Sequence, residues 1–257
     1  MERSSRWIAA AAVPVLAVAA LVVGGGRFPP QARAGVAATP VFGAPTVFTN
    51  PFFPFQPGGS RISAGKADGT ASVILDSFLA ETRDIPWNGG TVSCRVLVET
   101  NFEGGRLIEN TRNYFAQADG GAVYYFGETV DTYENGVVTG HDGSWLVGGA
   151  GGGDPAGTMT AADPALFMPA APQEGDVFMP ENVPAGPREE DTVRRTGRTV
   201  KVPGGVFPGC IEVLEHDLVD GDFETKWYAP GVGVVRGRTQ GETFALVATT
   251  LPGAQGK

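Results

Sequence analysis

Few side chains in this sequence could carry out nucleophilic chemistry. A serine nucleophile would be Ser144, with His141 or His216 as its base and Asp217, next to His216, as the acid that orients the base. Ser144 lacks the flanking glycines of a hydrolase nucleophile elbow. With only two histidines and no His-Glu-x-x-His pattern, a catalytic zinc site is not expected. We assign no catalytic residue, and these four residues are the ones to test if the protein is a secreted hydrolase.

Acidic side chains could instead bind calcium or cleave a glycosidic bond. Four of them crowd one expected hairpin: Asp217, Asp220, Asp222 and Glu224. Their order does not match the oxygen ligands of an EF-hand loop. Glu128 and Asp131 could form a pair of glycosidase carboxyl groups only if folding made them converge. Solvated turn carboxylates are the simpler interpretation, so we predict no metal and no cofactor and keep the hairpin as the calcium alternative.

Aromatic side chains are the more suggestive group. Seven of them lie on or beside expected strands: Tyr114, Tyr124, Phe126, Tyr133, Trp145, Trp227 and Tyr228. A sheet curved around them would form an apolar cavity with hydroxyl and indole donors at its edge, which is the composition of a small-molecule site. Ordinary core packing is the alternative. We predict these seven as ligand-binding residues.

The elements that must position these residues are strands. The 38 glycines and 20 prolines make up about twice the usual share of the chain and disfavour long helices. From residue 50 onward the hydrophobic period is two, as where Val92, Cys94, Val96 and Val98 share one face. Asn135-Gly136 is a strong hairpin signal. The pattern predicts an all-β fold over 50–251, a single antiparallel meander or partly closed barrel of about nine to eleven strands.

Residues 140–190 interrupt this pattern with a Gly/Pro-rich excursion. Gly148–Gly153 is nearly pure glycine, and prolines are dense up to Pro187. The excursion also carries apolar side chains: Trp145, Leu166, Phe167, Met168, Phe178 and Met179. These indicate that it docks on the sheet as a long covering loop. Long loops of this kind are often functional, so we expect a binding site beneath it.

The N-terminal residues 1–34 have the pattern of a signal peptide. Arg3 and Arg6 precede an uncharged stretch over 8–23, and Ala32-Arg33-Ala34 predicts cleavage between Ala34 and Gly35. The apolar stretch is shorter than the roughly 20 residues that favour a membrane span, so we prefer a cleaved signal to an anchor. We expect a secreted or cell-envelope protein without a transmembrane segment, a flexible lead-in at 35–49 and a short tail at 252–257.

The mature chain would be acidic. Residues 1–34 hold four arginines and one glutamate, so the net charge of −9 becomes −12 after cleavage. This charge disfavours nucleic acid and anionic membranes as partners. Cys94 and Cys210 are an even pair in an exported chain and predict a disulfide, which would restrain the unfolded state by about 4–5 kcal/mol. Two buried free thiols are the alternative.

Several phrases of the sequence resemble a group of exported bacterial β-proteins of uncharacterised activity. In chain order they are Asn50-Pro51-Phe52-Phe53-Pro54, 114–119 (YFAQAD), 123–128 (VYYFGE), 133–136 (YENG), Gly143-Ser144-Trp145, 202–207 (VPGGVF) and 226–235 (KWYAPGVGVV). The last two phrases are also similar, more distantly, to lipoprotein-carrier half-barrels. The resemblance spans about residues 50 to 250 and implies a β fold and export, without any catalytic motif.

We therefore interpret the chain as an exported β-protein that acts without covalent chemistry. It would bind an apolar or amphipathic small ligand, or an envelope component, beneath the 140–190 excursion. A secreted hydrolase and a structural cell-envelope protein are the alternatives.

Overall fold

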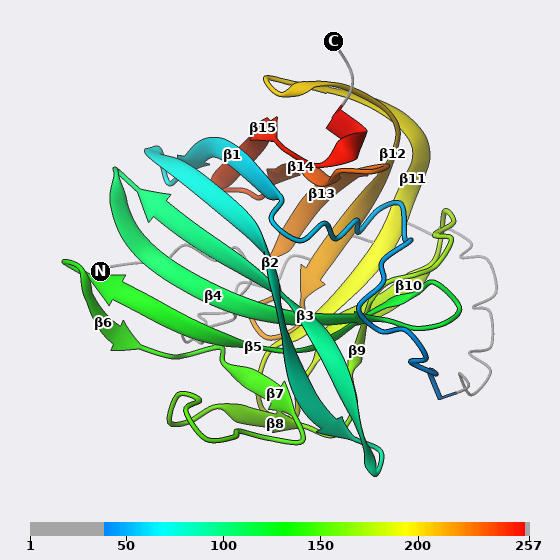
Figure 1. Cartoon of the computed structure of the whole chain (residues 1–257). Coiled ribbons are helices and arrows are strands. Elements are labelled where there is room, and N and C mark those ends of the chain that lie inside the picture. Colours follow the sequence, from blue (N-terminus) through cyan, green and yellow to red (C-terminus); the bar gives the residue numbers. More distant parts are fainter. Residues whose placement is uncertain (1–38, 255–257) are drawn as a thin grey trace, which may run out of the picture.

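A computed structural model describes residues 39–254, so the predicted signal segment 1–34 lies outside the described residues (Figure 1). The described residues form fifteen strands and one 3₁₀ helix. These elements are β1 (Ser60–Ala67), β2 (Thr70–Trp87), β3 (Gly90–Glu103), β4 (Arg106–Gln117), β5 (Val123–Glu134), β6 (Val137–Gly140), β7 (Trp145–Val147), β8 (Met159–Ala161), β9 (Ala165–Met168), β10 (Val177–Asn182), β11 (Arg188–Val202), β12 (Gly205–Asp217), β13 (Phe223–Ala229), β14 (Gly233–Arg238), β15 (Glu242–Thr249) and η1 (Pro252–Ala254). Among the described residues no helix has the length and apolarity needed to cross a membrane.

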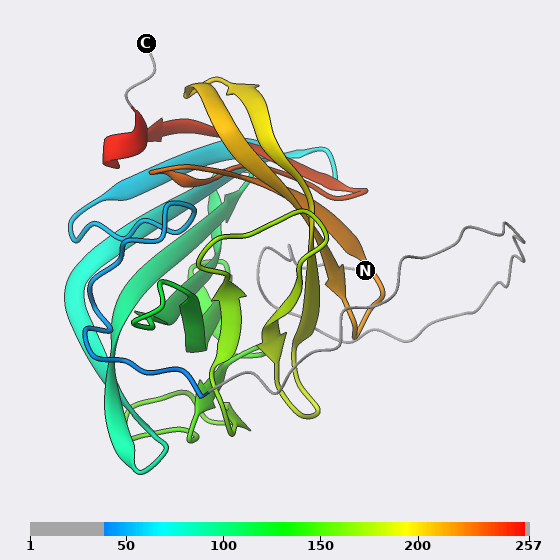
Figure 2. The same ribbon diagram turned by 90° about the vertical axis from the view of Figure 1, so that its right-hand side faces the viewer.

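The strands form one curled sheet whose order largely follows the chain. Strands β1 to β5 form one meander, β10 to β15 form a second, and β15 pairs with β1 to join them. The pairs are antiparallel except for β7 and β8, which are parallel. Strand β9 pairs with β5 and lies beside β10 without a hydrogen-bonded register, so the barrel is nearly closed (Figures 1 and 2). We refer to this boundary between β9 and β10 as the seam.

The predicted all-β, partly closed barrel is confirmed, with more strands than expected. The difference comes from residues 140–190, where β7, β8, β9 and β10 lie within the predicted covering loop. These strands are short, and prolines and glycines separate them, so no alternating pattern reveals them. The predicted Asn135-Gly136 turn is present, with φ of 52° and 80° at its two residues.

Both faces of the sheet are buried over part of β3, β4 and β5. Residues paired across strands share a face, and the inner face carries apolar side chains such as Phe78 and Leu97, which are register partners. The face of Val92, Cys94 and Val96 is also buried, but it is the outer face. There Val96, together with Tyr114, lines a cleft closed by the loop around residues 152–155. The excursion therefore covers the outside of β2–β5 as well as completing the sheet.

The segment before β1 packs on the sheet instead of forming a flexible lead-in over its described part, residues 39–49. Phe42 makes edge-on ring contacts with Trp87 and Tyr124, at 5.6 Å between centroids in each case. The amide of Asp119 donates to the carbonyl of Val41. Because these contacts bury aromatic surface and pair backbone groups, the small polar residues around them are held in place.

Candidate functional site

The inner face carries an unusual number of carboxyl groups, which we call the inner acidic group. Its members are Asp76, Glu99, Glu109, Glu128, Glu181, Glu189, Asp191, Glu215 and Glu224. All are buried except Glu189, which is half-buried. Acidic side chains are almost never buried in globular proteins unless they are paired, so this half of the barrel interior is not an ordinary core.

Electrostatic contacts between distant strands show that these carboxyl groups face a common interior. Glu99 lies on β3 and Lys226 on β13, far apart in the strand order, yet the charge of Lys226 lowers the pKa of Glu99. Burial raises the pKa of Glu99 to about 8, with Asp76 and Glu109 acting in the same direction. Burial also raises the pKa of Glu128 well above its usual range, and Glu181 across the interior adds to this. Glu99 therefore holds a proton near neutral pH.

Two cations and several hydroxyl or amide groups partly compensate the inner acidic group. Arg61 donates to Asp76 at 2.9 Å, and both side chains are buried. Lys226 lies 2.6 Å from a Glu215 oxygen and 3.6 Å from a Glu224 oxygen. Burial alone would lower the pKa of Lys226, but these carboxylates raise it well above its ordinary value. Lys226 is thus charged inside the barrel.

Compensation is incomplete, because several buried oxygens of the inner acidic group have no hydrogen-bond partner. They are Asp76 Oδ1, Glu128 Oε1, Asp191 Oδ1 and Glu224 Oε1. A buried polar atom without a partner costs about 1–3 kcal/mol and calls for an explanation, such as an ion or a ligand group. The interior is therefore chemically suited to positively charged or hydrogen-bond-donating species.

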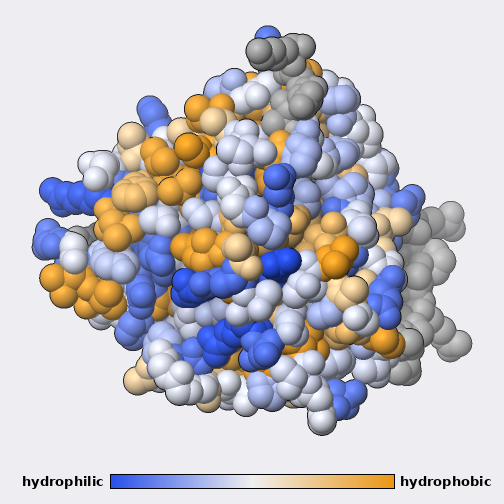
Figure 3. Space-filling model, in the orientation of Figure 1, coloured by the Kyte–Doolittle hydropathy of each residue, from blue (hydrophilic) through white to orange (hydrophobic). Residues whose placement is uncertain are grey.

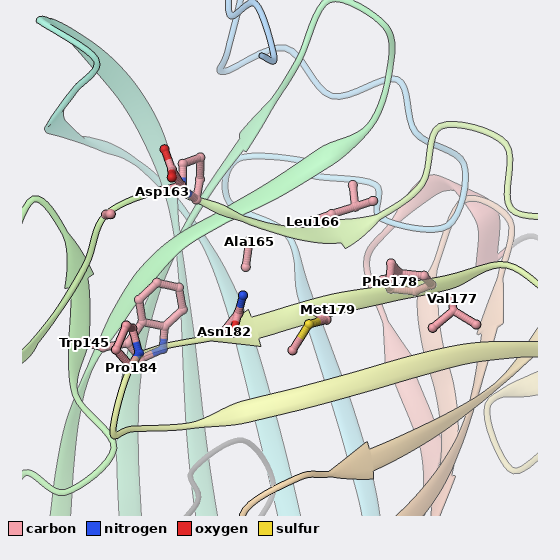
Figure 4. Close-up of a pocket in the computed structure, with 11 residues that line it drawn as sticks. Trp145, Asp163, Ala165, Leu166, Val177, Phe178, Met179, Asn182 and Pro184 are labelled. Atoms are coloured by element: carbon pink, nitrogen blue, oxygen red, sulfur yellow. The ribbon is translucent and has the colours of Figure 1, made fainter. Parts of the chain in front are cut away.

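A second feature is an apolar cleft on the seam, of about 450 Å³, which we call the seam cleft. It is lined by Trp145, Ala162, Asp163, Pro164, Ala165, Leu166, Val177, Phe178, Met179, Asn182 and Pro184. Figure 4 shows the β9 side chains and the β10 side chains on its two sides, with Trp145 at one end and Val177 at the other. Asp163 and Asn182 supply polar groups to an otherwise apolar lining.

Close backbone packing brings Trp145 to this position. Gly127 on β5 has φ of 124°, and a Cβ there would lie 2.2 Å from the Trp145 carbonyl oxygen. Only glycine allows β7 to approach β5 this closely. The Trp145 ring is fully buried against Tyr125, and its indole N–H donates to Glu181 at 3.0 Å. Trp145 therefore connects the seam cleft with the inner acidic group.

A third feature is a polar cleft of about 700 Å³ on the outer face of β2–β5. Figure 3 shows hydrophilic side chains gathered on this side of the molecule, over β4 and β5. Arg83 donates to both carboxylate oxygens of Asp154 and to the Tyr114 hydroxyl. The two other basic residues, Arg112 and His141, also have acidic partners. The basic side chains of the polar cleft are thus already paired within the protein.

The predicted aromatic residues do not line one cavity. Tyr114, Tyr124 and Phe126 lie on the outer face of β4 and β5, where Phe42 contacts both Tyr124 and Phe126. Tyr114 is 3% exposed and belongs to the outer polar cleft. Tyr133 is half-buried near the end of β5.

Trp145, Trp227 and Tyr228 take up three different positions. Trp145 lines the seam cleft, as described above. The Tyr228 hydroxyl donates to Glu215 at 3.3 Å inside the barrel. The neighbouring Trp227 points to the opposite face, where its N–H donates to Glu212. The prediction of a ligand site from these residues therefore stays open, with Trp145 at the most suitable cleft.

The nucleophile candidates have structural partners. Ser144 is 1% exposed, and its hydroxyl accepts the backbone amide of Val130. His141 pairs with Asp131 on the outer face. His216 lies on β12 with its ring stacked on Phe223, remote in the sheet order from β7. These contacts do not assemble a serine–histidine pair.

The acidic candidates do not form one site. Asp217 accepts the amides of Val219 and Asp220 and so stabilises the hairpin turn. Glu224 belongs instead to the inner acidic group. Glu128 points inward while Asp131 pairs with His141 outside, as expected for residues three apart on a strand, so the two carboxyl groups do not converge.

The predicted disulfide is wrong. Cys94 and Cys210 are both free and fully buried, on β3 and β12. They belong to separate hydrophobic clusters, and each thiol donates to a nearby carbonyl, of Val92 and Phe207 respectively. Burial raises the pKa of both thiols, that of Cys210 to about 11. The two residues are therefore small apolar core residues with unreactive thiols.

The inner acidic group is not predicted from the sequence, although a weak signal exists. Glu189 and Asp191 are two apart on one strand, as are Glu215 and Asp217 on the next, so each pair shares a face. Each pair looks like the solvent side of a strand when it is considered alone. Only the curling of the sheet turns that side inward.

Comparisons with known proteins identify little beyond this geometry. No protein-family model and no curated protein matches the chain. One solved structure, described as "a putative lipoprotein from Parabacteroides distasonis", matches with a TM-score of 0.34 and 13% sequence identity, over 77% of this chain and 98% of that chain. A likeness at this level supports no functional argument.

Proposed function

We propose that this is an exported binding protein that takes an apolar or amphipathic small ligand into the seam cleft. The observation that carries the proposal is the composition of the cleft. Every lining residue lies between positions 145 and 184, inside the excursion for which the sequence predicts a binding role. A volume of about 450 Å³ is within the range of small-molecule sites. The pattern of residues 1–34 supports export.

The cleft lies on the seam, where β9 and β10 are neighbours without a hydrogen-bonded register. Val177 is 58% exposed and Met179 is half-buried, so apolar surface is accessible there. Flexible methionine side chains adapt to ligands of different shape. Asp163 and Asn182 offer polar contacts to a hydroxyl or amine group, as an amphipathic ligand requires.

Nile red, an uncharged apolar dye, is a suitable first probe because the acidic protein does not repel it. We expect saturable binding with enhanced dye fluorescence, and we expect Met179→Asp to weaken it at least tenfold by placing a charge in the cleft. Val137→Asp is the matched control, since Val137 is 65% exposed on the β5–β6 hairpin, away from the seam. Circular dichroism confirms that both variants fold.

Equal dye binding by the wild type and Met179→Asp would contradict the proposal, and so would an equal loss in Val137→Asp. Native mass spectrometry of protein purified from its secreting host gives a second test. A bound small molecule that Met179→Asp loses would support the seam cleft as its site.

A further inference from the structure

Three carboxyl groups inside the barrel are arranged as the ligands of one metal ion. Glu189 and Asp191 alternate on β11 and so share the inner face, and Asp191 is the register partner of Glu215 on β12. One ligand oxygen from each residue lies within 4.8 Å of the others. Oxygens bound to Ca²⁺ at about 2.3–2.6 Å are at most about 5 Å apart, so the spacing fits one ion.

Independent evidence comes from buried oxygens that lack a partner. Asp191 is 3% exposed, and its Oδ1 has no hydrogen-bond donor. Glu224, opposite Glu215 on β13, is 8% exposed, and its Oε1 has none either. Carboxylate oxygens are costly to bury without compensation. A cation held by Glu189, Asp191 and Glu215 would remove that cost at Asp191.

The local charge balance also leaves room for a cation. Glu181 pairs opposite Glu189, and Glu224 pairs opposite Glu215, so five carboxyl groups meet here. Lys226 supplies one positive charge through its contacts with Glu215 and Glu224.

The donor atoms select the class of ion. All three are carboxylate oxygens, which suit Ca²⁺, Mg²⁺ and Mn²⁺, whereas Zn²⁺ and Cu²⁺ favour sites with histidine or cysteine. Lys226 and the Tyr228 hydroxyl contact the Glu215 carboxylate and fix its orientation. We propose that Glu189, Asp191 and Glu215 form a buried site for a hard divalent cation, with Ca²⁺ as the favoured ion.

This site differs from the predicted hairpin alternative. There, Asp217 is the register partner of Glu189 but uses its carboxylate to stabilise the turn, and Glu224 is the register partner of Glu215. The cation site also does not depend on the seam cleft, because Met179 lines only the cleft and Glu189 belongs only to the cation site. The failure of either proposal would thus leave the other standing.

Calorimetric titration of CaCl₂ into chelator-treated full-length protein tests the site. We expect one Ca²⁺ per chain and a rise in the thermal midpoint that saturates with the ion. Asp191→Asn should weaken binding at least tenfold, because asparagine keeps the shape of the protonated acid but lacks the charge. Glu190→Gln is the matched control, since Glu190 lies between the two ligands on β11 and faces the other way.

Terbium luminescence provides a second measurement. Tb³⁺ replaces Ca²⁺ and is excited through nearby aromatic rings, and Tyr228 contacts the ligand Glu215 directly. We expect Tb³⁺ emission that Ca²⁺ competes away and that Glu189→Gln abolishes. The proposal is overturned if neither heat nor emission is observed with the wild type, if the ligand variants bind as the wild type does, or if Glu190→Gln loses binding equally.

Discussion

The inner acidic group predicts that stability falls as the pH rises, and Glu109 allows the clearest test. Glu109 lies on the inner face of β4 opposite Asn101, is 5% exposed and accepts the Thr111 hydroxyl at 3.1 Å. Burial raises its pKa from 4.5 to about 7, while the hydrogen bond from Thr111 acts in the opposite direction. The folded protein therefore keeps a proton on Glu109 that the unfolded chain releases near pH 4.5.

The sign of the effect follows from which state binds the proton more tightly. The folded state binds the Glu109 proton more tightly than the unfolded state does. The stabilisation that this proton provides is therefore fully present below pH 4.5 and is lost as the pH rises through about 7. A pKa change from 4.5 to about 7 corresponds to about 3 kcal/mol. Glutamine resembles the protonated acid and does not titrate. We expect Glu109→Gln to match the wild type at pH 4 and to exceed its stability by about 3 kcal/mol at pH 8.

Urea unfolding, followed by tryptophan fluorescence from pH 4 to 8 with a chelator present, measures this difference. Glu134→Gln is the control, since Glu134 is an exposed glutamate on the β5–β6 hairpin. Its stability should follow the wild type at every pH. Parallel curves for Glu109→Gln and the wild type would refute the reasoning, because they would show that Glu109 ionises normally in the fold.

Two further predictions concern other buried groups. Arg61→Ala leaves Asp76, which is 4% exposed, without its cation, so we expect the free energy of unfolding in urea to fall by about 3–5 kcal/mol. Adding Asp76→Asn should restore part of this loss, and a loss below about 1 kcal/mol would contradict the prediction. In denaturant without reductant, both Cys94 and Cys210 should react with iodoacetamide, whereas neither should react in the folded protein. Intact mass measures the added groups, and a denatured protein without any added group would contain a disulfide instead.

The period of two and the turn residues predict the fold class because each acts locally. A strand face and an Asn-Gly turn depend on neighbouring residues alone. Val92, Cys94 and Val96 could be identified as buried in this way, but not as outer-face residues, since the loop that lines the cleft beside Val96 is more than fifty positions later in the chain. Local patterns therefore predict which residues are buried better than they predict what covers them.

The candidate sites depend on register, which the sequence alone does not determine. Glu189, Asp191 and Glu215 come together only because β11 and β12 pair with Asp191 opposite Glu215. The disulfide prediction failed for the same reason: counting cysteines cannot place Cys94 and Cys210 in one cluster. The excursion is the exception, because its apolar residues predict that it docks on the sheet whatever the register of the strands.

A polar interior in a nearly closed barrel needs a physical justification, because buried carboxyl groups weaken a fold that could use apolar residues instead. Here one part of the interior is apolar, with Phe78, Leu97 and Phe115, and it forms a hydrophobic core. The acidic part contains the proposed cation site. Trp145 lies at the boundary, lining the seam cleft while its indole donates to Glu181.

A substitution of Trp145 would therefore disturb both proposed sites and could not distinguish them. Met179→Asp and Glu189→Gln each change one site, so their effects on dye and cation binding should be separable. If Met179→Asp also lowers Ca²⁺ affinity, or Glu189→Gln lowers dye affinity, each substitution acts on the other site as well as on its own. If the two ligands are themselves coupled, bound Ca²⁺ must change the dye affinity by the same factor as bound dye changes the Ca²⁺ affinity. Wild-type protein titrated with dye in the presence and absence of Ca²⁺ measures that coupling directly.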